Sequence, residues 1–159
     1  MNPLFRIDFS ISDSLKIVRK SVLIYETIIE AMFKACNEYY NLNLSEETRK
    51  MFSVMGLGMQ TEQSCCGAFT VAAGIIGLLT AEEGHTDADN IEGYQMICAL
   101  TDFMLESCGT LHCVELQKLE IEGYENPCHA IVEALAKVLE DILSQRSSGS
   151  KADDRQVLS

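Results

Sequence analysis

Hydrophobic residues near the start of the chain recur at the spacing of an α-helix. The apolar positions that fall on one helical face are Leu15, Val18, Val22, Ile29, Met32 and Cys36. Neither glycine nor proline interrupts this stretch, and Ser12 or Asp13 is a suitable N-cap. The pattern therefore predicts one long helix that ends near residue 41, after an irregular lead-in.

A second, shorter helix is predicted to begin after Ser45. Two glutamates follow this capping serine in the first turn, where negative charge stabilises a helix, and the glycines at positions 56 and 58 break the helix. Met51, Met55 and Met59 follow one another at intervals of four residues. Because thioethers fill irregular gaps in apolar surroundings, we expect these methionines to pack in the core.

The third and fourth helices are predicted over about residues 62–82 and 88–107. Each glycine of the third, Gly67, Gly74 and Gly77, lowers helix stability by about 1 kcal/mol relative to alanine. We therefore expect a neighbouring helix or a ligand to approach this helix closely, and a homodimer is one arrangement that would provide such a contact. The positions of the fourth helix expected to face inward are Ile91, Tyr94, Ile97, Cys98, Thr101 and Met104 or Leu105.

Boundary residues mark the end of the fourth helix and the start of the last one. Gly109 suits a left-handed stop, whereas Asn126 is a cap and Pro127 takes the first helical position. The predicted fold class is all-α, an up-and-down bundle of four to five helices. Residues 1–145 form a single helical domain, and the polar, unpatterned residues 146–159 are expected to be a disordered tail.

Charge limits the classes of partner that the chain would bind. The formal net charge is −12, and an acidic surface repels phosphate backbones and anionic lipid. We therefore expect no nucleic-acid or membrane partner, and we expect a partner protein that presents a basic patch. The longest apolar run, residues 68–81, is too short to span a bilayer, and residues 1–10 lack the features of a signal peptide. These observations favour a cytoplasmic protein.

Seven cysteines carry the candidate chemistry. In a reducing compartment such cysteines are buried, bound to metal or catalytic more often than they are bridged. Up-and-down connectivity sends several of them to one end of the bundle: Cys66, Cys108, Cys113 and Cys128. There they lie at helix termini, and unpaired N–H groups at a helix start favour the thiolate that redox chemistry and metal binding need. Cys36 and Cys98 are expected to be core residues instead.

Three segments of the chain carry a resemblance to a known family. These are Cys66-Gly67-Ala68 with Gly74 and Gly77, the run from Gly109 to Leu116 that contains Cys113, and Cys128 at the last helix. Together with Met55-Gly56-Leu57-Gly58-Met59, they resemble the C_GCAxxG_C_C family of putative redox-active proteins over about residues 20–143. The cysteine that this family would place near Tyr25 or Glu26 is absent here, and its glycine at position 71 is Val71.

The resemblance implies a helical domain whose cysteines bind an iron–sulfur cluster or carry out thiol redox chemistry. We expect Cys66, Cys113 and Cys128 to serve as redox groups or cluster ligands for electron transfer, with their sulfurs within reach of one cluster. A fourth ligand would have to come from Cys65, Cys108, His112 or Glu26. The resemblance also implies that the expected partner protein, the one with a basic patch, is a redox partner.

Three alternatives to the cluster remain open. In the first, a metal-free thiol–disulfide redox protein, Cys66 attacks and Cys113 or Cys128 resolves. In the second, a structural zinc ion staples the end of the bundle. In the third, the chain is a degenerate family member that has lost its site and acts as a non-catalytic interaction module.

Overall fold

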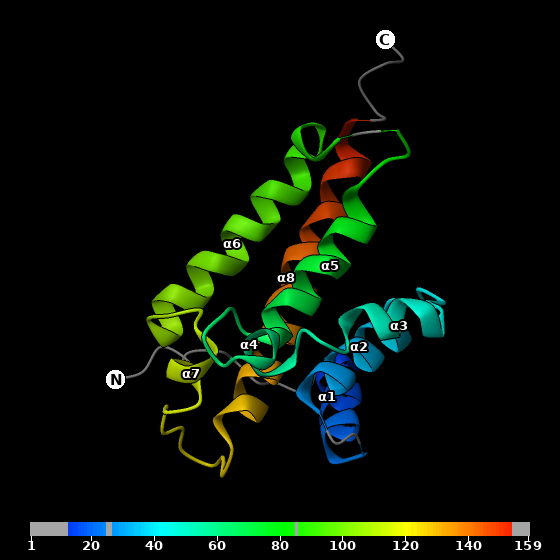
Figure 1. Ribbon diagram of the computed structural model, residues 1–159. Helices are drawn as coiled ribbons and strands as arrows, with labels where there is room; N and C mark the ends of the chain where they lie inside the picture. Colours follow the sequence, from blue (N-terminus) through cyan, green and yellow to red (C-terminus); the bar gives the residue numbers. More distant parts are fainter. Residues whose placement is uncertain (1–12, 25–26, 85, 154–159) are drawn as a thin grey trace.

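The computed structural model describes residues 13–24, 27–84 and 86–153 of the chain (Figure 1). The elements in order are α1 (Asp13–Ile24), α2 (Ile28–Tyr39), α3 (Glu46–Phe52), α4 (Gly56–Gln60), α5 (Gly67–Thr80), the 3-10 helix η2 (Asp87–Asp89), α6 (Ile91–Cys108), α7 (Cys113–Leu116) and α8 (Pro127–Asp153). No strand forms within the described residues, so the predicted all-α class is confirmed.

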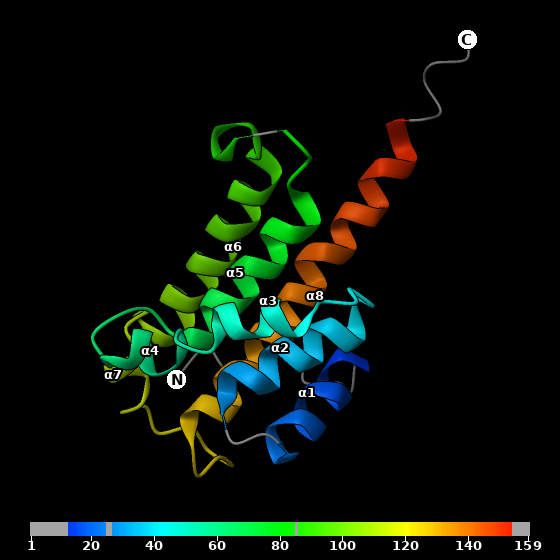
Figure 2. The ribbon, with the colours of Figure 1, turned by 45° about the vertical axis from the view of Figure 1, so that its right-hand side comes forward.

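Two helical hairpins pack on the long helix α8. The helices α5 and α6 form one hairpin and both contact α8, whereas α1 and α2 form a second hairpin that contacts its lower half (Figures 1 and 2). The core between them is closed by fully buried side chains from four helices: Phe33, Ile75, Ile76, Leu100 and Leu135. Within the described part of the chain, no helix has the length and uninterrupted apolar character needed to traverse a lipid bilayer.

The prediction of one long first helix is wrong, because the chain folds back between α1 and α2. Thr27 has an extended backbone (φ −125°, ψ 144°), and its side-chain oxygen accepts a hydrogen bond from the N–H of Glu30. This cap starts a new helix at a point where the hydrophobic periodicity of the sequence continues without a break. Folding back lets α1 and α2 pack both on each other and on α8.

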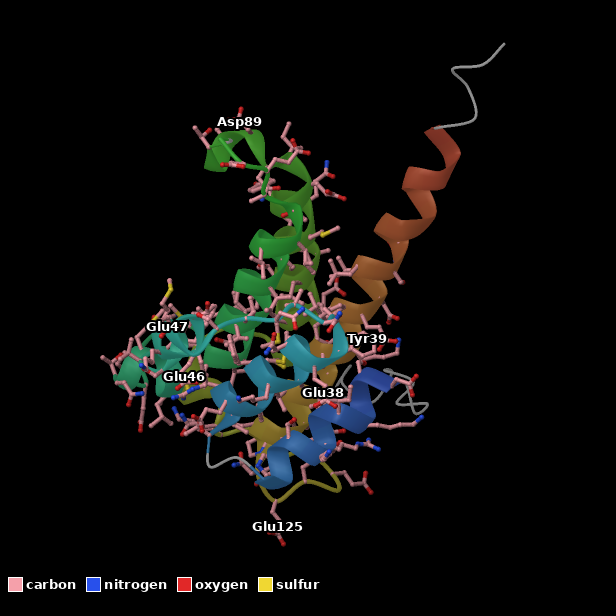
Figure 3. The ribbon with its side chains drawn as sticks, turned by 90° about the vertical axis from the view of Figure 1, so that its right-hand side faces the viewer. Glu38, Tyr39, Glu46, Glu47, Asp89 and Glu125 are labelled. Carbon is pink, nitrogen blue, oxygen red and sulfur yellow. The ribbon has the colours of Figure 1, made fainter. Side chains whose placement is uncertain are left out.

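Polar contacts tie this N-terminal hairpin to α8. The hydroxyls of Ser14 in α1 and Tyr39 in α2 both donate to the carboxylate of Glu140. Tyr39 is labelled at the end of α2 in Figure 3. Arg19 Nε donates to Glu133 Oε2 at 2.8 Å, and Glu133 is buried. A carboxylate in such a position is stabilised only by charged or hydrogen-bonding partners, so these contacts set how the hairpin docks.

Several predicted helix boundaries are confirmed. The side chain of Ser45 accepts from the N–H of Thr48 at the start of α3. Gly109 is left-handed (φ 75°) after α6, and Asn126 Oδ1 accepts from the N–H of Cys128 after Pro127 begins α8. The last helix continues to Asp153, eight residues beyond the expected end at 145, and the division into a domain and a tail stays a prediction.

The inward face of α6 is the predicted one only in part. Met104 is buried and Ile97 packs against the core as predicted, whereas Ile91 and Tyr94 are exposed. The buried face consists of Gly93, Met96, Leu100, Met104 and Ser107. The reason lies at Gly93, where a Cβ would stand 2.6 Å from Thr80 Oγ1. Only glycine allows the end of α5 to come this close, so the side of α6 that carries Gly93 faces α5.

The core prediction for the methionines at 51 and 59 is also wrong. Met51 and Met59 are exposed, and only Met55 packs against the core. Met51 belongs to α3, which is short and has no completely buried residue. Of the side chains of α3, Phe52 is the one that packs against the core, and Met51 points away from it.

Neighbouring tyrosines at the end of α2 provide a stability test. The hydroxyl of Tyr40 is buried and finds no hydrogen-bond partner among the described residues, whereas that of Tyr39 donates to Glu140 at 3.0 Å. Tyr40→Phe should leave the free energy of unfolding unchanged or raise it by up to about 1 kcal/mol, because it removes an unpaired polar group. Tyr39→Phe should lower it by about 1 kcal/mol. Urea unfolding of both variants checks this, and a loss of stability in Tyr40→Phe would show that its hydroxyl has a partner.

Candidate functional site

Backbone pairing between two distant loops brings Cys65 and Cys66 close to Cys113. The segments are residues 62–66, before α5, and residues 111–114, at the start of α7. Cys66 N–H donates to the carbonyl of Leu111 at 2.9 Å, and Cys113 N–H donates to that of Ser64 at 2.9 Å. A further hydrogen bond joins Val114 N–H to the carbonyl of Glu62 at 3.0 Å.

This pairing corrects the predicted start of the third helix. Cys65 and Cys66 were expected in its first turn, but α5 begins at Gly67 and Cys66 is the residue before it. Cys65 pairs across an antiparallel bridge with His112. Because these backbone groups are engaged between loops, they cannot also form the first turn of a helix.

A left-handed turn covers the paired loops. The φ angles of Leu57, Gly58, Met59 and Gln60 are all positive, between 47° and 62°. A left-handed conformation costs about 1–2 kcal/mol for each residue other than glycine, so such a run forms only where surrounding contacts hold it. A Cβ at Gly58 would stand 2.8 Å from the Cβ of Cys113 and 3.0 Å from the carbonyl oxygen of Ser64. Glycine at this position therefore allows the backbone of the turn to pack directly against Cys113.

Cys66, Cys113 and Cys128 all line one cavity of about 900 Å³. They come from three separate elements, which meet at the end of the bundle where α4, α7 and the starts of α5 and α8 gather (Figure 1). The walls between them are largely apolar and include Ile29, Phe33 and Ile131. The structure thus brings together the three cysteines that connectivity predicted, and their redox or ligand role stays a prediction.

The residues proposed to complete the site lie elsewhere. Cys65 and Cys108 are partly buried against the core and do not line the cavity, and the side chain of His112 is exposed. Glu26 falls outside the described residues. Cys36 is buried in the core as expected. The core prediction for Cys98 is wrong, because it is partly exposed and belongs to neither cluster of core residues.

Burial is the largest influence on the pKa of Cys65, Cys66 and Cys128, and it raises each of them. The expected preference for thiolate is therefore corrected. Burial raises the pKa of Cys66 from an ordinary 9.0 to about 12, although the N–H groups of Phe69 and Ala68 act in the opposite direction. The helix start therefore acts on Cys66 as predicted, but it is outweighed by desolvation. Burial also raises the pKa of Cys65 and Cys128.

Cys113 is the common neighbour of the other thiols. Burial is the main cause that raises the pKa of Cys65, Cys66 and Cys128, and a charge on Cys113 acts in the same direction on each of them. The side-chain amide of Gln117, one helical turn later, donates a hydrogen bond to Cys113 Sγ at 3.1 Å. An N–H donor aimed at sulfur stabilises negative charge on it. Cys113 is thus the cavity cysteine whose sulfur accepts a hydrogen bond from a side-chain amide.

The donor set does not fit a metal ion as it is arranged. Among residues 13–24, 27–84 and 86–153, no three side chains of His, Cys, Asp or Glu form a group that could hold one. A tetrahedral zinc site requires four such ligands at bonding distance. The zinc staple expected as an alternative is therefore not built from these residues.

Comparison with known proteins places this arrangement in a family. A family model described as "Putative redox-active protein (C_GCAxxG_C_C)" matches residues 29–142, well over half of the chain. The chain belongs to this family. The C_GCAxxG_C_C match contains all three cavity cysteines and confirms the resemblance drawn from the motifs. A search of curated proteins and a search of solved structures each produced no match.

Two features of the site were missed by sequence reasoning. One is Gln117, a residue whose type is common on helix surfaces; its position four residues after Cys113 was the available signal. The other is the left-handed turn, since the glycines at 56 and 58 indicated only a helix break. A contact between Gly58 and Cys113 joins residues far apart in the chain and has no local signature.

Glycine substitutions should separate the site from the rest of the fold. Gly58→Ala should lower the free energy of unfolding by about 2–3 kcal/mol and displace Cys113, since it adds both a strained φ and a clash. Gly77→Ala is the matched control, because a Cβ there meets no atom within 4 Å, and it should raise stability by about 1 kcal/mol. Urea unfolding measures both effects. Equal stability of the two variants would contradict the close contact.

The raised thiol pKa values predict a loss of stability in alkali. Burial raises the pKa of Cys36 and Cys66 to about 12 and that of Cys108 to about 11, against 9.0 ordinarily. The folded state therefore favours the protonated thiols, and their contribution is full below pH 9 and is lost as the pH rises from about 9 to 12. Cys36→Ala should reduce this decline relative to the wild type. Urea unfolding at several pH values across this window measures it, and parallel declines would contradict the assignment.

Proposed function

We propose that this chain is a thiol–disulfide redox protein that works through Cys66, Cys113 and Cys128. The observation that carries the proposal is the cavity lined by all three cysteines, in which Gln117 donates a hydrogen bond to the sulfur of Cys113. Membership of a family described as redox-active supports the same reading. Because the cavity is lined by protein on several sides, a bound disulfide would be held against the thiols in a fixed orientation.

Cys113 is the proposed attacking group. The earlier expectation that Cys66 attacks is less favourable, because burial raises the pKa of the Cys66 thiol and, within the described residues, no side-chain amide donor is aimed at its sulfur. Gln117 Nε2 instead donates to the sulfur of Cys113. Its thiolate attacks one sulfur of a substrate disulfide, the bond between the substrate sulfurs breaks, and the leaving thiolate takes a proton from the medium.

A second cysteine completes the exchange. Cys66 or Cys128 loses its proton and attacks the mixed disulfide at Cys113, which releases the other half of the substrate as a second thiol. The balance is one substrate disulfide reduced to two thiols and two protein thiols oxidised to one disulfide. Burial raises the pKa of Cys66 and Cys128, and a charge on Cys113 raises it further; formation of the mixed disulfide removes that charge, which favours ionisation of the second cysteine at this step.

An iron–sulfur cluster is the competing proposal. It is supported by the same convergence of three cysteines, since thiolates are the usual ligands of such clusters. A cluster spreads its ligands further apart than a single ion does, but it would still require the three sulfurs to form one ligand set. Among the described residues no three His, Cys, Asp or Glu side chains form a group that could hold a metal ion, whereas thiol exchange requires only two cysteines to meet, so we favour thiol exchange.

Cysteine variants provide the test. Wild-type protein, reduced and then exposed to a small disulfide, should form one internal disulfide that mass spectrometry assigns to Cys113 and a partner. Cys113→Ser should react as slowly as the triple variant lacking all three cavity cysteines, because groups that act as a unit give non-additive losses. Gln117→Leu should slow the reaction about tenfold through the lost hydrogen bond.

Two controls make the test decisive. Cys98→Ser removes a partly exposed cysteine outside the cavity and should leave the rate unchanged. Anaerobically purified protein should contain neither iron nor sulfide in stoichiometric amount. A brown protein whose iron is lost in each of the three cavity variants would replace thiol exchange by the cluster proposal. Wild-type rates in Cys113→Ser, together with a wild-type protein free of iron, would rule out both.

A further inference from the structure

The cysteines of the cavity are recessed, which limits what can reach them. Cys66 and Cys113 are buried, at 9% and 7% exposed, and Cys128 is partly buried. A disulfide on the surface of a folded protein would have to enter the cavity together with its own backbone. A cavity of about 900 Å³ is instead in the range of small-molecule sites.

Most polar side chains around the cavity already have a partner within the protein. Gln60 and Glu125, which also line it, are exposed, and Glu125 points away from the rest of the molecule (Figure 3). A polar or charged ligand that left water for this cavity would therefore find few free partners for its own groups. The lining side chains that are engaged within the protein are Thr27, Glu30, Arg49, Ser53, Gln117 and Asn126.

Apolar side chains form the rest of the wall. Ile29, Phe33 and Ile131 line the cavity and are at most 5% exposed, whereas Leu57 lines it and is 56% exposed. The apolar wall therefore extends from the core of the protein to its surface. Each methylene group that moves from water to such a wall strengthens binding about fourfold.

We propose that the disulfide substrate of this cavity is small and uncharged, with hydrocarbon arms on both sides of its S–S bond. This inference rests on the proposed thiol–disulfide function and names its substrate class. The S–S bond would meet Cys113, and the arms would contact the wall that contains Ile29, Phe33 and Leu57. The substrate is reduced to two thiols while two cavity cysteines are oxidised to one disulfide.

A series of disulfides with arms of different length tests the proposal: dimethyl, diethyl and dipropyl disulfide, with cystamine and dithiodiglycolate as charged comparisons. Reduced protein is mixed with each in about 0.5 M salt, which screens attraction by the net charge of −12. The loss of free thiols is followed over a single turnover. Each rate constant is divided by that of a simple thiol in solution, which removes differences in intrinsic reactivity.

The normalised rate should rise about fourfold for each added methylene group that enters the cavity. Both charged disulfides should be slower than diethyl disulfide, since their charged groups would lose water without gaining a free partner. Normalised rates that do not depend on arm length, or a charged disulfide that reacts fastest, would overturn the proposal.

Matched leucine variants locate the wall that is responsible. Leu57→Asn should lower the ratio of the dipropyl rate to the dimethyl rate about threefold, and it adds no backbone strain, because asparagine tolerates the positive φ of this position better than leucine does. Leu78→Asn changes a leucine of similar exposure, 51%, that lies on α5 outside the cavity, and it should leave the ratio unchanged. An equal fall in both variants, or an unchanged ratio in Leu57→Asn, would contradict binding in this cavity.

Alkylation separates this inference from the proposed function, because it requires no disulfide exchange. N-Ethylmaleimide and N-pentylmaleimide are compared, and peptide mapping gives the rate at each cysteine. The ratio of the pentyl rate to the ethyl rate should be about tenfold higher at Cys113 than at Cys98, which is partly exposed and lies outside the cavity.

Two results distinguish the two possible failures. Disulfides that react at equal normalised rates, with equal maleimide ratios at Cys113 and Cys98, would overturn the apolar substrate and leave thiol exchange intact. If no disulfide reacts, the proposed function fails and the substrate class fails with it, and the maleimide ratio then shows whether the cavity still admits apolar chains.

Discussion

The pairing of residues 62–66 with residues 111–114 is the constraint on which the site depends. It is made of backbone hydrogen bonds, so it fixes the relative position of two loops whatever their side chains are. Gly58 then packs against Cys113 from the other side at a distance that excludes any larger residue. Because one loop precedes α5 and the other begins α7, the pairing also determines where two helices of the bundle start.

Two opposing effects set the chemistry of the thiols. A helix start stabilises negative charge on a neighbouring sulfur, and the N–H groups of Ala68 and Phe69 do so for Cys66. The apolar walls of the cavity act against this, because a thiolate removed from water loses its hydration. At Cys66 desolvation is the larger effect, whereas Cys113 has an amide donor of its own in Gln117. Cysteines that look equivalent by position are therefore different in chemistry.

The same end of the bundle combines strain, exposed apolar residues and recessed thiols. Leu57 has a positive φ, lines the cavity and is more than half exposed. Each of these properties lowers stability, and in a well-packed domain they are usually avoided. Their coincidence beside Cys113 is what distinguishes this end from the opposite one, where the α5–α6 hairpin ends in an ordinary polar turn (Figure 2). Local rules are relaxed where a site needs an unusual backbone.

The sequence by itself determined the all-α class, most helix ends and the identity of the three cavity cysteines. These follow from local signals: 3.6-residue periodicity, the caps at Ser45 and Asn126, and the connectivity that sends three helix termini to one end. It could not reveal the reversal at Thr27 or the side of α6 that faces α5, because both depend on which helix packs opposite. It was also unable to rank the thiols, since their pKa values depend on burial, and burial exists only once distant segments meet. The tertiary structure decided these points, through contacts between residues that are far apart in the chain.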